Sequence, residues 1–203
     1  MKLDVVRYII SKFTDKAETP EELDARLNFA HGQLFAMRWK ELDMDSLRPF
    51  KKTMGGETPP MMITTGNQFG YGLLPTDYFM WESASIMYGG EEKDVEFVED
   101  DEWDNRKRNY IETPTFEFPI TNMQSDRLRC LPRGIQYLNF SYIRKPEVIR
   151  FGYTKAKGFI EYDPATSVEL PWDDANAIQI IIMVLQDMGV SATKEQVEKA
   201  RKQ

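Results

Sequence analysis

The chain has 203 residues, 41% of them hydrophobic and 29% charged, which suits one large globular domain or one domain with extensions. Its formal net charge of -7 disfavours nucleic acid as a partner, because an acidic surface repels phosphates. No apolar run reaches the roughly 18 residues of a membrane span, and the single cysteine, Cys130, excludes an internal disulfide.

Two helices are predicted at the start of the chain. Apolar residues recur at helical spacing from Leu3 to Phe13. Thr19-Pro20-Glu21-Glu22 then combines an N-cap, a proline at the first helical position and a glutamate three residues after the cap. The apolar positions that follow continue at helical spacing, so the second helix is expected to end at about Leu42.

A long irregular loop is predicted from Phe50 to Pro75, because glycines and prolines recur throughout this segment. At most one short strand is expected in it, from Met61 to Thr65. A loop of this length is usually functional or ordered by a partner. Several of its side chains are too apolar for a free loop, and we therefore predict contacts between subunits at Met61, Met62, Phe69 and Tyr71.

The middle of the chain is predicted to alternate between helices and strands. Leu74 to Tyr88 is apolar nearly all round and is expected to form a buried helix that Gly89-Gly90 ends. The expected elements that follow are a half-buried strand, a short helix that carries Trp103 and a further strand: Asp94 to Val98, Asp101 to Asn109 and Arg127 to Leu131.

The last third predicts two strands and two helices. The strands are Ile135 to Ile143 and Gly158 to Tyr162. Pro171 fits the first position of a helix whose main body runs from Asp173 to Met188, and Thr193-x-x-Gln196 is a capping box that starts another. The predicted fold class is therefore α+β, with N-terminal helices, a central mixed β-sheet and a C-terminal helix pair. We expect an N-terminal part, 1–90, and a C-terminal part, 91–203, in one compact unit.

The sequence predicts no catalytic residue, no metal site and no cofactor. His31 is the only histidine and lies in the long helix, where a packed or surface role is favoured over catalysis. Cys130 lies in a strand-like run, which is typical of a buried structural cysteine.

A dense acidic run lies between residues 91 and 104. A two-metal nuclease also needs clustered carboxylates, but those usually converge from separate elements, whereas a contiguous run is typical of a solvated surface. We therefore predict an acidic channel or surface patch formed by Glu91, Glu92, Asp94, Glu96, Glu99, Asp100, Asp101, Glu102 and Asp104.

Basic residues occur in small sets near aromatic ones, a mixture that single-strand binders also use. The neighbouring acids largely cancel their field, so ion pairs with the acidic run of the same or a neighbouring chain are favoured. The sets are Arg106-Lys107-Arg108, Arg127 with Arg129 and Arg133, and Arg144-Lys145.

Several segments resemble a known family. They are SYIRKPEV from Ser141, SVELPWDDANAI from Ser167, DMGVSATKEQVEKA from Asp187, and VEFVEDDEWDNRKRNYIETPTFEFPI from Val95 to Ile120. Their order is similar to that of a structural protein family of tailed phages that infect Bacteroidetes, the crAss-like group and its relatives. The resemblance covers about half of the chain and concerns residues that shape the fold.

The resemblance implies a virion protein in a ring of the head–tail connector, assembled in the host cytoplasm. Its partners would be the portal protein, other neck or tail proteins and its own copies, in a cyclic homo-oligomer of about twelve subunits. No membrane and no stable nucleic-acid binding is expected. The alternatives are a tail-tube, tail-hub or minor head protein, and, from other classes, a metal-dependent nuclease or a nucleic-acid-binding module.

Overall fold

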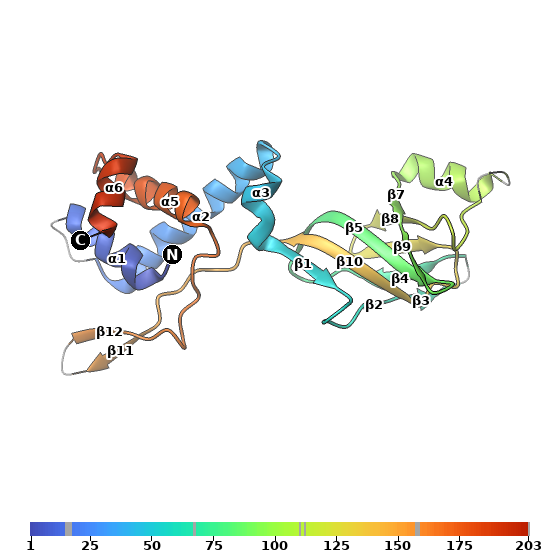
Figure 1. Ribbon diagram of the computed structural model, residues 1–203, viewed down its shortest axis with the longest axis horizontal. Helices are drawn as coiled ribbons and strands as arrows, with labels where there is room; N and C mark the ends of the chain where they lie inside the picture. Colours follow the sequence, from blue (N-terminus) through green and yellow to red (C-terminus); the bar gives the residue numbers. More distant parts are fainter. Residues whose placement is uncertain (15–17, 67, 110, 112, 157–158, 203) are drawn as a thin grey trace. The chain divides into compact units, whose positions relative to one another are not determined.

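The protein is described by a computed structural model that covers residues 1–14, 18–66, 68–109, 111, 113–156 and 159–202. Its fold class is α+β, as predicted (Figure 1). The chain forms two compact units, and one of them combines two segments that are far apart in the sequence. The helical unit combines Met1–Phe50 with Pro146–Gln203, and the β unit is Lys51–Lys145. The expected division at residue 90 is therefore not the one found, because strands on either side of that residue pair with each other.

The helical unit begins with α1 (Leu3–Phe13) and the long α2 (Pro20–Lys40). The predicted capping box is present, since the Thr19 hydroxyl accepts from the Glu22 amide while the Glu22 carboxylate accepts from the Thr19 amide. Two short helices follow, α3 (Met44–Leu47) and a 3-10 turn, Arg48–Phe50. The second predicted cap, at Thr193, likewise starts α6 (Lys194–Arg201).

The core of the helical unit forms around α5 (Asp174–Asp187), which packs against α1, α2 and α6. Its N-cap is Asp173, so Pro171 precedes the helix and is not its first residue. Trp172 is buried, and its ring packs edge-on against that of Phe50. The remaining strands of this unit, β11 (Tyr153–Ala156) and β12 (Phe159–Tyr162), form a hairpin, and Gly158 lies outside the described residues.

Long-range hydrogen bonds tie the returning chain to α2. The Asn28 amide group donates to the carbonyl of Ile149 and accepts from its N–H, and Asp24 accepts from the N–H of Phe151. Burial raises the pKa of Asp24. These contacts attach the chain from Pro146 onward to α2, so that it belongs to the helical unit.

The β unit contains two sheets. The first has the order β1 (Lys51–Met54), β10 (Tyr137–Arg144), β5 (Tyr78–Tyr88) and β6 (Glu91–Asp94), with β2 (Met61–Met62) also paired to β10. The second has the order β3 (Thr64–Thr65), β4 (Gly70–Leu73), β9 (Arg127–Leu131), β8 (Ile120–Gln124) and β7 (Glu96–Phe97). Only β7 and β8 pair in parallel among the described strand pairs. The short helix α4 (Asp100–Arg108) confirms the helix predicted around Trp103.

The prediction of a helix from Leu74 to Tyr88 is wrong, since most of this segment is the central strand β5. Its aromatic residues suit a strand paired on both sides, with β10 and with β6. Gly89 and Gly90 both have positive φ, at 62° and 85°, and make a tight turn into β6. They therefore end a strand of a hairpin and not a helix.

The predicted loop from Phe50 to Pro75 is also largely wrong, because β1 to β4 lie within it, although β2 and β3 lie where the one short strand was expected, from Met61 to Thr65. The strands that were not predicted, β1 and β4, are short and pair with the distant β10 and β9, so no local alternation of apolar residues marked them. The prediction of a strand from Asp94 to Val98 is partly wrong too, because the segment is divided between β6 and β7. The strand predicted from Arg127 to Leu131 matches β9.

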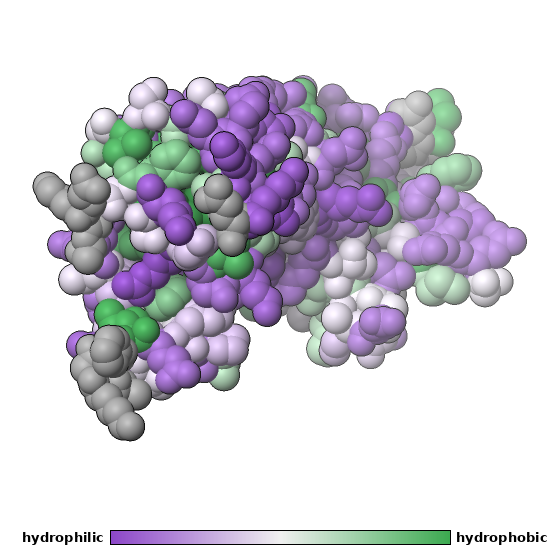
Figure 2. Space-filling model, turned by 60° about the vertical axis from the view of Figure 1, so that its left-hand side comes forward, coloured by the Kyte–Doolittle hydropathy of each residue, from purple (hydrophilic) through white to green (hydrophobic). Residues whose placement is uncertain are grey.

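The core of the β unit is rich in aromatic side chains. Phe140 is fully buried and its ring lies 5.1 Å from that of Tyr142 and 5.3 Å from that of Trp81. A smaller cluster under α4 surrounds the buried Trp103. The face that comes forward in the space-filling view is mostly hydrophilic, with hydrophobic residues in small patches (Figure 2). No helix among the described residues is long and apolar enough to cross a membrane.

Candidate functional site

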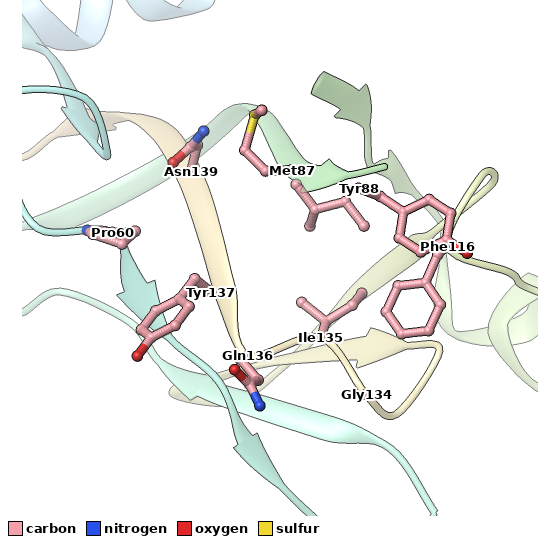
Figure 3. Close-up of a pocket in the computed structure, with 10 residues that line it drawn as sticks. Pro60, Met87, Tyr88, Phe116, Gly134, Ile135, Gln136, Tyr137 and Asn139 are labelled. Carbon is pink, nitrogen blue, oxygen red and sulfur yellow. The ribbon is translucent and has the colours of Figure 1, made fainter. Parts of the chain in front are cut away.

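A hollow of about 380 Å³ opens on the β unit where the end of β5 meets the start of β10. Its lining is largely apolar and aromatic, and Figure 3 shows these side chains around one space, with the rings of Tyr88 and Phe116 together at one side. The lining residues are Pro60, Ile86, Met87, Tyr88, Phe116, Gly134, Ile135, Gln136, Tyr137 and Asn139.

The hairpin of β5 and β6 determines which side chains border the hollow. Successive residues of a strand point to opposite faces, so Ile86 is buried in the core while Met87 is 65% exposed. The glycine turn directly after Tyr88 ends the strand there and leaves the Tyr88 ring at the rim.

The far side of the hollow is formed by Phe116, which stacks on Tyr88 with ring centroids 5.0 Å apart. A Cβ at Gly134 would lie 2.9 Å from Phe116 Cζ, so the glycine allows this close approach. Glu117, the residue after Phe116, forms an ion pair with Lys93, in which its carboxylate oxygen lies 2.8 Å from Lys93 Nζ. Lys93 Nζ also lies 2.7 Å from a carboxylate oxygen of Glu91. These two carboxylates raise the pKa of Lys93, so it is charged across the physiological range.

Large apolar side chains around the hollow are exposed to solvent. Tyr137 on β10 lies directly opposite Met62 on β2 in the strand register, and these residues are 56% and 73% exposed. Phe118, two residues after Phe116, is 79% exposed. A concave apolar surface with exposed methionine and aromatic side chains is typical of a site that binds apolar side chains of another protein.

The four residues predicted to contact other subunits have different environments. Met62 is exposed beside the hollow, but Met61 is 2% exposed and belongs to the core, because neighbouring residues of β2 face opposite ways. Phe69 packs on Trp103, and the guanidinium of Arg127 lies over the ring of Tyr71. Burial thus contradicts a surface role for Met61, whereas the other three stay predictions.

The acidic run is distributed over β6, β7 and α4. Its side chains are mostly exposed, and some of them form ion pairs: Arg106 contacts Glu96 and Glu102, and Arg129 contacts Asp100. The favoured interpretation of the basic sets, ion pairs with the acidic run, is confirmed at these arginines. Among the described residues, no three His, Cys, Asp or Glu side chains lie together as a metal site would require.

The only histidine and the only cysteine are both buried. Burial lowers the pKa of His31 to about 4, and its ring meets the edges of Phe50 and Trp172. Burial raises the pKa of Cys130 to about 12, and a hydrogen bond joins its thiol to the Thr121 hydroxyl. At neutral pH the first is therefore an uncharged core residue and the second is an unreactive thiol.

Most residues that line the hollow are not marked as site residues by the sequence. Met87 and Tyr88 were assigned to a helix, and Phe116 and Tyr137 were not distinguished from core residues. The one available signal was Gly89-Gly90 directly after two large apolar residues, which is typical of a hairpin end that exposes them.

No model of a known protein family matches the chain, and a comparison with curated proteins finds no match.

Proposed function

We infer that the chain is a structural protein of a tailed-phage virion, a ring component of the head–tail connector that assembles around the portal axis. The resemblance of residues 95–120 and of three later segments to the crAss-like family motivates this proposal. The observation that carries it is the apolar hollow with its exposed rim, because a surface of this kind is stabilised by a neighbouring chain.

The rim is suited to a repeated contact between subunits. Met62, Met87 and Tyr137 offer large apolar areas that lose contact with water when a neighbour covers them. A contact between two different surfaces of identical chains generates a closed ring when the rotation per subunit is suitable. In such a ring, the hollow of each subunit receives side chains of the next.

The charge of the chain is compatible with a channel for DNA. Each copy contributes a formal net charge of -7, and repetition around a ring multiplies the field. A channel lined by carboxylates does not retain phosphates, whereas a basic lining would hold the genome through salt-dependent contacts. The exposed acids of β6 and α4 are the densest source of this charge.

The proposal is tested by electron microscopy and sedimentation of the full chain. The wild-type protein is expected to form closed rings, alone or when mixed with the portal and neck proteins of its phage. Met62→Glu places a charge directly opposite Tyr137, a lining residue of the hollow, and is expected to abolish the rings.

Thr64→Glu is the matched control, because Thr64 is an exposed residue of β3, the next strand along the chain, and receives the same charge. It is expected to leave the rings intact. Absence of rings in every mixture, or rings that form equally well with Met62→Glu, would contradict the proposal.

A further inference from the structure

The helix α2 has an exposed face that is almost uncharged along its middle. Residues at successive turns of this face are small or apolar, and only its two ends are charged: Glu21, Ala25, Phe29, Gly32, Ala36 and Lys40. We call these six residues the α2 strip. The opposite face of the helix is buried in the core of the helical unit through residues such as Leu27 and Leu34. A helix that is apolar on both faces is expected to be covered on both.

Two features of the strip have no explanation within a single chain. Phe29 is 62% exposed although its ring is the largest side chain on this face. Gly32 lies in the interior of a 21-residue helix, where glycine is destabilising by roughly 0.5–1 kcal/mol relative to alanine. Outside the helix backbone, no described atom lies within 4 Å of a Cβ added there, so no contact within the chain requires the glycine.

The strip is complementary to itself when a second copy runs in the opposite direction. Phe29 and Gly32 lie equally far from the point between Ala30 and His31, so a two-fold axis at that point places each Phe29 ring over the partner's Gly32. The large side chain then fills the space that the missing side chain leaves.

The same axis matches the outer positions of the strip. Ala25 is placed opposite Ala36, which allows the two helices to approach closely, and Glu21 is placed opposite Lys40. The first turn of α2 is acidic and its last turn is basic, so an antiparallel pair joins opposite charges at both ends, whereas a parallel pair would join like charges.

We propose that two copies of this chain dimerise through the α2 strip as an antiparallel helix pair. The contact is isologous, because the same surface is used on both copies, and it is therefore different from the contact that closes a ring. It does not rest on the proposed function. Glu21 keeps a second partner within its own chain, since the Tyr153 hydroxyl donates to its Oε1.

The first test uses the full chain with Met62→Glu, which removes the proposed ring contact and leaves α2 unchanged. Sedimentation equilibrium up to about 100 µM, a range that detects micromolar dissociation constants, is expected to show a dimer. Adding Gly32→Glu is expected to give a monomer, because the new side chain occupies the space of the partner's Phe29. Helicity measured by circular dichroism should be retained, since glutamate is a better helix former than glycine.

The second test reverses the charges at the ends of the strip. Glu21→Lys and Lys40→Glu each turn two attractive pairs into repulsive ones, and each is expected to weaken the dimer roughly tenfold. The double variant restores opposite charges and is expected to recover the wild-type dissociation constant to within about threefold. A monomer at every concentration, a dimer unaffected by Gly32→Glu, or single reversals that the double variant does not rescue would overturn the proposal.

Discussion

The buried polar side chains of the two units differ in one respect, which is that those of the helical unit include His31, a group that ordinarily titrates near neutral pH. In the β unit, the buried amide of Asn122 donates to the Val98 carbonyl and accepts from Arg129, and the buried Thr121 hydroxyl donates to the Arg129 carbonyl. In the helical unit, neither ring nitrogen of His31 nor the indole nitrogen of Trp172 has a partner among the described residues. The helical unit therefore contains a core group whose protonation opposes folding, whereas the hydrogen-bonded groups of the β unit do not titrate near neutral pH.

The largest expected loss of stability comes from a charge placed in the apolar core of the helical unit. Ile181 on α5 is fully buried, so Ile181→Asp places an unpaired charge in that core, which costs on the order of 3–5 kcal/mol. We expect the helical unit to unfold, as measured by loss of helical circular dichroism.

The matched control is Ala175→Asp, which puts the same charge on an exposed residue in the first turn of α5, where the helix dipole favours an acid. It should retain wild-type stability. Equal stability of both variants would show that the core of this unit is not formed around α5. Ile178→Asp should act as Ile181→Asp does, and Ile182→Asp less severely, because Ile182 is only half-buried.

The next largest effect concerns the pH dependence of stability that arises from the buried His31. Its pKa is about 4 in the folded chain and about 6.5 when unfolded, so between these values the unfolded chain binds a proton that the folded chain does not. Stability therefore falls as the pH falls through this window, by about 2 kcal/mol between pH 7 and pH 5. His31→Leu should remove this part of the pH dependence, as measured by urea unfolding at both values. The same change in unfolding free energy in both proteins would contradict the neutral, buried histidine.

The smallest effect concerns a helix cap. Thr193→Ala removes the capping box of α6 and is expected to lower the free energy of unfolding by about 1 kcal/mol. Thr64→Ala, on an exposed strand of the β unit, should change it by less than about 0.5 kcal/mol. Thermal unfolding of the two variants compares them, and equal losses would mean that the cap contributes nothing specific.

How much of the fold could be predicted from the sequence depends on whether an element is formed by local or by long-range contacts. The starts of α2 and α6 were predicted correctly because Thr19 and Thr193 form their capping boxes with residues three positions away. The strand β5 was mistaken for a helix because its main pairing, with β10, joins residues far apart in the sequence that no local pattern reveals. Its hairpin with β6 is marked in the sequence only by Gly89-Gly90. The return of the chain to the helical unit after Lys145 depends on Asn28 and Asp24, more than 100 residues earlier.

The candidate site was predicted only in part for the same reason. Met62, which lies opposite the lining residue Tyr137, was singled out because an apolar residue in a segment rich in glycine and proline is conspicuous. Met87 and Tyr137 become neighbours of the same hollow only through the pairing of strands, so their exposure could not be predicted from their own segments.

The central claim is that a neighbouring chain covers the apolar hollow of the β unit. It is tested most directly by the reactivity of a cysteine introduced as Met87→Cys, since the native Cys130 is buried with a pKa raised to about 12. A thiol reagent should modify this cysteine slowly in the assembled protein and rapidly in the unassembled Met62→Glu background. Equal rates in the two forms would show that the hollow stays open on assembly, and would contradict the claim.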